Sequence, residues 1–169
     1  MVAVESIGAG GGSIARVEAT GALKVGPRSA GAVPGPACYG QGGIEPTVSD
    51  ANLLLGYLNP GRVYGGSIHL DPARAEAVIA PLPERFRLTL IEAAHGVVEV
   101  ANANMLRALR LVSVQRGYDL REFSLIAFGG AGPLHAGALA RAAGISSLVV
   151  LAHSGPFSLP GLLVAPLRH

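Results

Sequence analysis

The sequence contains a single cysteine among its 169 residues, which excludes an internal disulfide and a Cys-x-x-Cys zinc site. Only 14% of the residues are charged, and the basic residues stand singly. The chain therefore lacks the basic runs and basic–aromatic stripes that are typical of nucleic-acid binding. No apolar run reaches the roughly 18–20 residues that a membrane-spanning helix needs, and no leader-like segment follows Met1. These absences favour a soluble, cytoplasmic protein.

Glycine, by contrast, is abundant. The 24 glycines are about twice the number that the average usage of ~7% would give. Half of the residues are hydrophobic, which excludes intrinsic disorder. The length suits one domain or a piece of a larger one. We therefore expect a packed chain with many tight turns and close backbone approaches.

The most informative stretch is an apolar run at residues 123–128 that predicts a buried strand. Three glycines interrupt the chain directly after it: Gly129, Gly130 and Gly132. Pro133 then suits the first turn of a helix, where its missing N–H costs nothing. A strand, glycine turn and helix start direct free backbone N–H groups and the positive end of a helix dipole at one spot. This arrangement suits an anion or a nucleotide.

The same stretch does not match the familiar nucleotide-binding motifs. His135 stands where the third glycine of G-x-G-x-x-G belongs, and no Gly-Lys-Ser/Thr follows. A tight connection between strand and helix without a ligand therefore remains the alternative interpretation.

A second glycine-rich stretch, here named the glycine segment, covers residues 8–12. The residues after it predict a hairpin, with strands at 13–17 and 23–25 and a turn at 19–21. The glycine segment is either a bulged corner of this hairpin or a place where a ligand or another strand approaches the backbone. Residues 26–46 then predict a long irregular segment. Cys38 within it is interpreted as a small buried thiol, because no neighbouring base would make it a nucleophile.

Thr47 and Asp50 have the spacing of a capping box, which predicts that a helix begins here and continues towards Leu58. Asp50 has two possible roles. It is a helix cap, or it is a carboxylate that projects into a glycine-lined cleft as a metal ligand or a base.

Further helices are predicted downstream. Asp71 and Pro72 begin one that Pro81 and Pro83 end, and residues 89–115 form the longest, with an apolar stripe at helical spacing. A strand at 147–151 and a weak helix at 162–167 follow the helix at 133–143. The order of helix, strand, helix and strand from residue 89 predicts parallel strands with a right-handed crossover. Ligands of such sheets bind at the carboxyl ends of the strands, where the glycine turn lies.

Several motifs together resemble the hydantoinase A/oxoprolinase family. They are SIGAGGGSIA at 6–15, VGP at 25–27 with SAG at 29–31, PGPACYG at 34–40, EPTVSDANL at 45–53, NANM at 102–105 and FGGAGPLH at 128–135. Their order and spacing extend along nearly the whole chain.

The resemblance implies an α/β fold, namely a ribonuclease H-like half of an actin-like ATPase fold of the kind found in Hsp70 and sugar kinases. Members of the family use ATP and a divalent metal to open cyclic amides such as hydantoins and 5-oxoproline, or they serve as subunits of ketone carboxylases. Gly129, Gly130 and Gly132 match the adenosine-side loop of that fold. A hydantoinase B-type subunit is the implied partner, and Asp50 and His135 are the implied catalytic candidates.

The sequence also departs from the family pattern. The amino-terminal phosphate loop, an Asp followed by Gly-Gly-Thr, and a second Gly-Gly-Thr segment are both missing from this sequence. The family often has an Asp-x-His pair before the first glycine cluster, with a plausible metal-binding role. Here the corresponding positions hold Ala3 and Glu5. Glu5 and Asp50 are therefore the candidate metal ligands. We therefore interpret residues 1–169 as the carboxyl-terminal portion of the ATPase domain, without its phosphate-loop half.

Three functions remain open at this point. The chain is part of an ATP-dependent cyclic amidohydrolase, a fragment of a ketone carboxylase subunit, or a non-catalytic assembly module that binds a hydantoinase B-type partner. Phosphoryl transfer depends on a phosphate cradle that the sequence lacks, so we expect the chain alone to be inactive.

Overall fold

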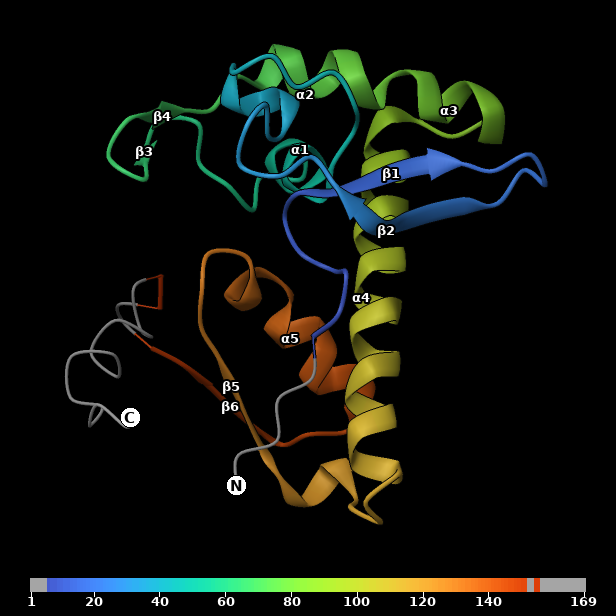
Figure 1. Ribbon diagram of the computed structural model, residues 1–169, viewed down its shortest axis with the longest axis vertical. Coiled ribbons are helices and arrows are strands. Elements are labelled where there is room, and N and C mark those ends of the chain that lie inside the picture. The colour runs from blue at the N-terminus through green and yellow to red at the C-terminus, as the bar shows by residue number, and fades with distance from the viewer. Residues whose placement is uncertain (1–5, 152–153, 156–169) are drawn as a thin grey trace, which may run out of the picture. The chain divides into compact units, whose positions relative to one another are not determined.

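A computed structural model describes residues 6–151 and 154–155 of the chain (Figure 1). The chain divides into two compact units, Met1–Met105 and Leu106–His169. The long helix α4 (Leu90–Val114) contributes to both units. The helix predicted at 162–167 lies outside the described residues.

The first unit begins with an antiparallel hairpin of β1 (Ser13–Val17) and β2 (Leu23–Ser29), which confirms the predicted hairpin. The register pairs Ala15 with Val25 and Val17 with Leu23, and a bulge separates Ser13 from Ala15. β2 is longer than predicted, because it continues through Pro27. A strand in a two-stranded sheet has a free edge, and a proline is tolerated there because its missing N–H leaves no ladder bond unmade.

The irregular segment that follows contains one turn of 3-10 helix, η1 (Ala37–Tyr39). Helix α1 (Val48–Leu54) begins after Thr47, whose hydroxyl accepts from the Asp50 N–H while the Asp50 carboxylate accepts from the Thr47 N–H. The predicted capping box is therefore confirmed. All six residues from Val48 to Leu53 are buried, so α1 is a helix of the interior.

After α1 the chain forms a small hairpin that the sequence analysis did not predict, β3 (Val63–Tyr64) and β4 (Ile68–His69). Helix α2 (Pro72–Ile79) begins as predicted, with Asp71 as its N-cap. α2 ends at Ile79, just before Pro81, as predicted. The sequence analysis did not predict the further helix α3 (Pro81–Phe86), which begins at Pro81 because proline fits the first turn of a helix without losing a hydrogen bond.

The core of the first unit lies between the β1–β2 hairpin, α1, α2, α3 and the start of α4. Helix α4 contributes an apolar stripe at helical spacing: Ala93, Ala94, Val97, Val98 and Ala101. Val97 is fully buried, and burial of a valine side chain stabilises the fold by roughly 1.5–3 kcal/mol. Asn104 on the same helix donates a hydrogen bond from Nδ2 to the Val25 carbonyl at 3.1 Å. That bond joins α4 to the hairpin across 79 positions of sequence.

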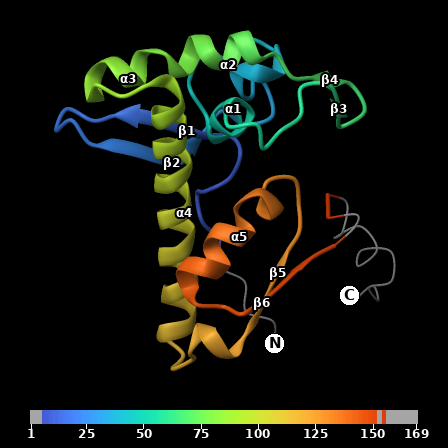
Figure 2. The ribbon, with the colours of Figure 1, turned by 180° about the vertical axis from the view of Figure 1, so that it is seen from behind.

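The second unit contains a 3-10 turn η2 (Leu120–Glu122), then β5 (Ser124–Ala127), α5 (Gly132–Ala143) and β6 (Ser147–Val150). β5 and β6 are parallel, with Ser124 beside Ser147 and Ala127 beside Val150. Figures 1 and 2 show α5 lying along the two strands, as the crossover between them. The predicted order of helix, strand, helix and strand is confirmed.

The β5–β6 sheet has one face without α5. Ala127 is buried towards α5, whereas its neighbour Ile126 and the paired Val149 point to the other side and are 55% and 41% exposed. Parallel sheets are normally covered on both faces. This sheet therefore presents an apolar face within the described part of the chain. None of the helices in the described ranges is long and apolar enough to cross a membrane.

Candidate functional site

The strand, glycine turn and helix predicted from the sequence are present, but the prediction that the strand is buried is wrong, because only Ala127 of β5 is buried and Ile126 is 55% exposed. Gly129 follows β5 with φ at +84°, a left-handed conformation that side chains rarely adopt, so glycine is required there. Its N–H donates to the Ser154 carbonyl at 2.6 Å, which ties the turn to the residues beyond β6. Gly132 begins α5, with Pro133 in the first turn. The turn thus lies at the carboxyl end of β5, as predicted.

The backbone of this turn is open. A Cβ atom placed on Gly129, Gly130 or Gly132 would have no described neighbour within 4 Å. Gly130 and Gly132 also have ordinary φ values, so neither packing nor conformation requires glycine at these two positions. Side chains here would occupy the space over the turn. The arrangement leaves room for another molecule to approach the backbone closely.

The start of α5 favours a negatively charged group. Its N-cap residue is Ala131, which makes no capping hydrogen bond with its side chain. The first backbone N–H groups of a helix have no partner within the helix, and they coincide with the positive end of the helix dipole. Pro133 has no N–H, and the Leu134 N–H donates to the Ala131 carbonyl at 3.0 Å. The helix dipole and the remaining N–H groups of this end, which no capping side chain of Ala131 occupies, are suited to an anion such as a phosphate group.

His135 lies in the first turn of α5, on the buried face that also carries Ala136, Leu139 and Ala140. Only 1% of the residue is exposed. Burial lowers the pKa of the imidazole, because the charged form loses solvation in the interior. The imidazole is therefore neutral at neutral pH, a state in which it can accept a proton.

Asp50 lies in the first unit and is fully buried. Its carboxylate accepts hydrogen bonds from the Cys38 N–H at 2.8 Å, the Thr47 N–H at 2.9 Å and the Thr47 hydroxyl at 2.7 Å. The side chain thus caps α1 and also fixes the irregular segment through Cys38. The structure supports its structural role, while its catalytic and metal-binding roles stay predictions.

Cys38 is fully buried beside this carboxylate. Burial raises the pKa of the thiol strongly, and the neighbouring Asp50 charge adds to the effect. The interpretation of Cys38 as a small packed thiol rather than a nucleophile is therefore supported.

The metal prediction finds no support in the described part of the chain. Three or more His, Cys, Asp or Glu side chains that could hold an ion do not come together anywhere within residues 6–151 and 154–155. Glu5 lies outside these residues. His135 and the three glycines belong to one element of the second unit, whereas Asp50 belongs to the first. The metal-binding roles of Glu5 and Asp50 stay predictions.

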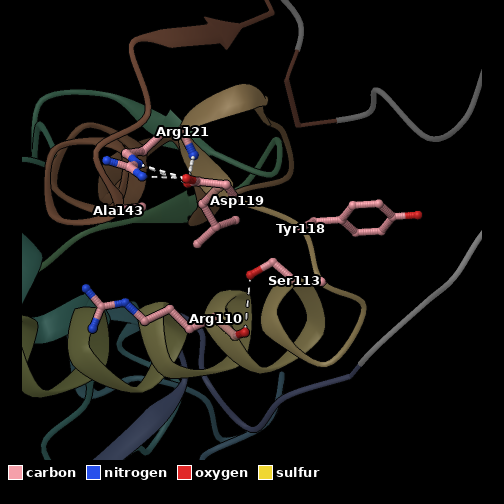
Figure 3. Close-up of a pocket in the computed structure, with 8 residues that line it drawn as sticks. Arg110, Ser113, Tyr118, Asp119, Arg121 and Ala143 are labelled. Carbon is pink, nitrogen blue, oxygen red and sulfur yellow. Dashed lines mark hydrogen bonds and ion pairs between the residues drawn. The ribbon is translucent and has the colours of Figure 1, made fainter.

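A surface hollow of about 460 Å³ lies near the carboxyl end of α5, at the opposite end from the glycine turn. Its lining comes from α4, η2 and the end of α5: Arg110, Ser113, Gly117, Tyr118, Asp119, Leu120, Arg121 and Ala143. Figure 3 shows Arg121 facing Asp119, with the Tyr118 ring directed away from them. The Arg121 guanidinium lowers the pKa of Asp119 to about 2. Sequence analysis did not find this hollow, because no local motif joins residues from three elements.

The arginines of the hollow already have partners. Arg121 donates to both carboxylate oxygens of Asp119, and Arg110 donates to the Ala142 carbonyl at 3.3 Å. The Arg110 bond joins the end of α5 to α4, whereas the Arg121–Asp119 pair lies within η2 and its N-cap. The hollow is therefore explained by packing within the second unit, and the glycine turn remains the better candidate for ligand contact.

The chain is similar to known proteins along most of its length. The caprolactamase subunit alpha of Pseudomonas jessenii is 51% identical over 152 residues, which is 89% of this chain and 22% of that protein. The 5-oxoprolinase 1 of Arabidopsis thaliana is 36% identical over 179 residues, which is 96% of this chain and 14% of that protein. The chain spans about a quarter or less of the length of the curated relatives that it matches.

Two solved structures have the same fold. The crystal structure of the ATP-dependent caprolactamase from Pseudomonas jessenii matches with a TM-score of 0.88 at 44% identity, over 100% of this chain and 25% of that one. Nucleotide-free acetone carboxylase matches with a TM-score of 0.85 at 33% identity, over 95% of this chain and 23% of that one. The family model for hydantoinase/oxoprolinase matches residues 1–169. The chain therefore belongs to the hydantoinase/oxoprolinase family.

Proposed function

We propose that this chain forms part of an ATP-dependent enzyme that opens a cyclic amide of the hydantoin or 5-oxoproline type, and that its glycine turn contacts the nucleotide. The observation that carries the proposal is the open backbone at Gly129, Gly130 and Gly132, next to an α5 start without a side-chain cap. Relatives described as ATP-dependent caprolactamase and 5-oxoprolinase support this substrate class.

The chemistry divides between the nucleotide and the protein. Bound ATP supplies a phosphoryl group that activates the otherwise stable ring amide, and positioning is the protein's main contribution to such a transfer. In our proposal the backbone of the glycine turn holds and orients the nucleotide. His135, in the first turn of α5, is the residue that we propose to take a proton from the water that attacks the activated ring carbon; its burial lowers its pKa and makes it a weak base, so the ring substrate must reach this side chain in the assembled enzyme.

The finer assignment of the fold also belongs to the proposal. We assign the parallel β5–α5–β6 crossover to a ribonuclease H-like half of an actin-like ATPase fold. The remaining portion, with the phosphate loops, then comes from further polypeptide. Two observations support such a partner. The chain spans only about a quarter of the length of a matched relative, and the β5–β6 sheet presents an apolar face at Ile126 and Val149. A hydantoinase B-type subunit is the second partner that we propose.

A second candidate function is a subunit of a ketone carboxylase. Similarity to the acetone carboxylase beta subunit of Xanthobacter autotrophicus, 36% identical over 172 residues, favours this alternative. The proposed nucleotide contact is common to both functions. The two are distinguished by the substrate, since one requires a lactam or hydantoin and the other requires a ketone with bicarbonate.

The test replaces Gly130 by valine in the enzyme assembled from this chain and the further polypeptide that its relatives contain. The new side chain meets no described neighbour, so the melting temperature should stay within about 2 °C, while nucleotide affinity should fall at least tenfold. The control is Gly137→Ala, a position on α5 itself where a Cβ likewise meets no described neighbour within 4 Å. It should leave affinity unchanged and stabilise the helix by about 0.5–1 kcal/mol.

Titration with a fluorescent, non-hydrolysable ATP analogue measures both variants. Equal affinity for the wild type and Gly130→Val would show that the nucleotide does not approach this turn. Equal losses for both variants would mean that the effect arises from α5 as a whole rather than from the turn.

A further inference from the structure

The β5–β6 sheet carries a group of exposed apolar side chains. Ile126 and Val149 are partners in the parallel register, and both are exposed on the side of the sheet away from α5. On the side of α5, Leu148 and Val150 of β6 are exposed as well, so α5 covers that strand only in part. Phe128, directly after β5, is half exposed. The side away from α5, which carries Ile126 and Val149, is here named the open face.

The two strands lack the features that protect a strand in water. β5 reads Ser-Leu-Ile-Ala and β6 reads Ser-Leu-Val-Val, so neither contains a charged residue or a proline. Strands with one face in water usually alternate polar and apolar residues, whereas the strands of covered parallel sheets are continuous apolar runs. Exposed strands of natural proteins also carry charges or prolines that prevent pairing with other chains. The composition of β5 and β6 therefore indicates a sheet that is covered on both faces.

The described part of the chain leaves the open face uncovered. Among the described elements, α5 packs closely on β5 and β6, and it lies on the other side of the sheet. The chain corresponds to 25% of the ATP-dependent caprolactamase chain, so three quarters of that polypeptide lie outside the matched part. Further polypeptide of this kind is the largest available source of a cover.

We propose that the open face is the docking surface for an apolar helix of this further polypeptide, which packs on Ile126 and Val149. Parallel strands are joined by crossovers, usually helices, and these helices cover the faces of the sheet. Neither side chain carries a charge or a hydrogen-bonding group, so the face fits the apolar stripe of an amphipathic helix. Strands of four residues are about 13 Å long, which matches roughly two turns of a helix. The docking rests on the function proposed above, in which further polypeptide completes the enzyme.

A second copy of the chain fits the open face less well. Stable interfaces bury roughly 1,200–2,000 Å² in total, and two strands of four residues offer far less. Association of two isolated chains through this face should therefore be weak, and the further polypeptide should displace it.

The single cysteine of the chain makes a labelling experiment possible. Cys38 is fully buried and burial raises the pKa of its thiol, so it should react slowly with iodoacetamide. Val149→Cys places an accessible thiol on the open face. Val63→Cys is the matched control, because Val63 is also an exposed valine of a strand, β3 in the first unit. Mass spectrometry of the peptides measures the labelling rate at each position.

The expected result is protection at one position only. In the isolated, dilute chain the two introduced thiols should react at rates within about threefold of each other, since both are exposed. In the assembled enzyme, Val149→Cys should react at least about tenfold more slowly, whereas Val63→Cys should react at its original rate.

A charge on the open face gives a second readout. Val149→Lys should weaken binding between the chain and the further polypeptide at least about tenfold, because the docked helix would leave the ammonium group without water. Val63→Lys should bind as the wild type does. Both variants should melt as the wild type in the isolated chain, since both side chains already lie in water there.

Each contrary outcome overturns the proposal. Protection of Val149→Cys in the isolated chain at every concentration would show that the chain itself covers the face. Protection that rises with chain concentration, and not with added further polypeptide, would assign the face to a second copy. Equal labelling of Val149→Cys in both states would show that nothing docks there, and equal slowing at both valines would show general shielding.

The labelling needs neither nucleotide nor ring substrate, so the two proposals fail separately. If the assembled enzyme protects Val149→Cys but does not bind the ATP analogue, the proposed function is wrong and the docking stands. If it binds the analogue and leaves Val149→Cys reactive, the docking is wrong.

Discussion

Replacing Asp50 by alanine should remove the main polar anchor of the first unit. Three hydrogen bonds would be lost, from the Cys38 N–H, the Thr47 N–H and the Thr47 hydroxyl. Loss of the cap costs about 1 kcal/mol. Each of the two buried backbone donors left without an acceptor costs about 1–3 kcal/mol more. The free energy of unfolding should therefore fall by at least about 3 kcal/mol, a large part of the 5–15 kcal/mol typical of a domain.

Two further variants make this prediction specific. Asp50→Asn keeps the side-chain volume and one acceptor oxygen. Only the N–H or O–H groups that bonded the other oxygen lose their acceptor, so the free energy of unfolding should fall by less, about 2 kcal/mol. Asp71→Ala removes a cap of the same chemistry from α2, where the carboxylate accepts from the Ala73 N–H in an exposed position. That loss should be about 1 kcal/mol. The predicted order of destabilisation is Asp50→Ala, then Asp50→Asn, then Asp71→Ala.

Urea unfolding followed by circular dichroism measures this order, because the unfolding midpoint shifts with the free energy while the slope stays constant. An Asp50→Ala variant as stable as Asp71→Ala would refute the structural reasoning. Turnover of the folded Asp50→Asn variant then tests the catalytic prediction. Wild-type turnover would assign Asp50 to the fold alone, whereas loss of turnover with a modest loss of stability would support a catalytic role.

The remaining predictions concern the second unit and the isolated chain. Burial lowers the pKa of His135 below its ordinary value of 6.5, so the unfolded chain binds more protons and the free energy of unfolding should fall as the pH drops below 6.5. The variant His135→Gln should weaken this pH dependence in thermal melts between pH 7.5 and 5.5. An unchanged pH dependence would contradict the burial argument. The isolated chain should self-associate through the open face of β5–β6, and Val149→Lys should reduce the associated fraction in sedimentation velocity, whereas an entirely monomeric wild type would contradict this. The pure chain should hydrolyse ATP no faster than a buffer blank in a phosphate-release assay, and turnover above that blank would disprove our view that the phosphate cradle comes from elsewhere.

The predictable features of this fold are those in which adjacent residues decide the structure. Thr47 and Asp50 specify a helix start because their side chains reach each other's backbone within one turn. The turn at Gly129 and the start of α5 at Gly132 and Pro133 follow from conformations that only glycine and proline favour. The same reasoning located the parallel strands on either side of α5.

Other features depend on residues that only the folded chain brings together. Pro81 ends α2 as predicted, but it also fits the first turn of a helix, and the local sequence did not indicate that α3 follows at once. The bond from Asn104 to Val25 connects distant parts of the sequence.

The candidate site shows the same division. The glycine turn was found from local pattern alone, and the resemblance then assigned it to the nucleotide. The burial of His135 was not predictable, because it depends on which face of α5 meets the rest of the second unit. The hydrogen bonds of Asp50 favoured one of the two roles that its spacing had left open.

A crystal structure of the assembled enzyme with a non-hydrolysable ATP analogue tests the central claim most directly. The claim predicts that atoms of the nucleotide contact the backbone of the turn at Gly129, Gly130 and Gly132, in the space where a side chain would meet no described neighbour. A nucleotide bound elsewhere, with the turn covered by protein or open to solvent, would contradict it.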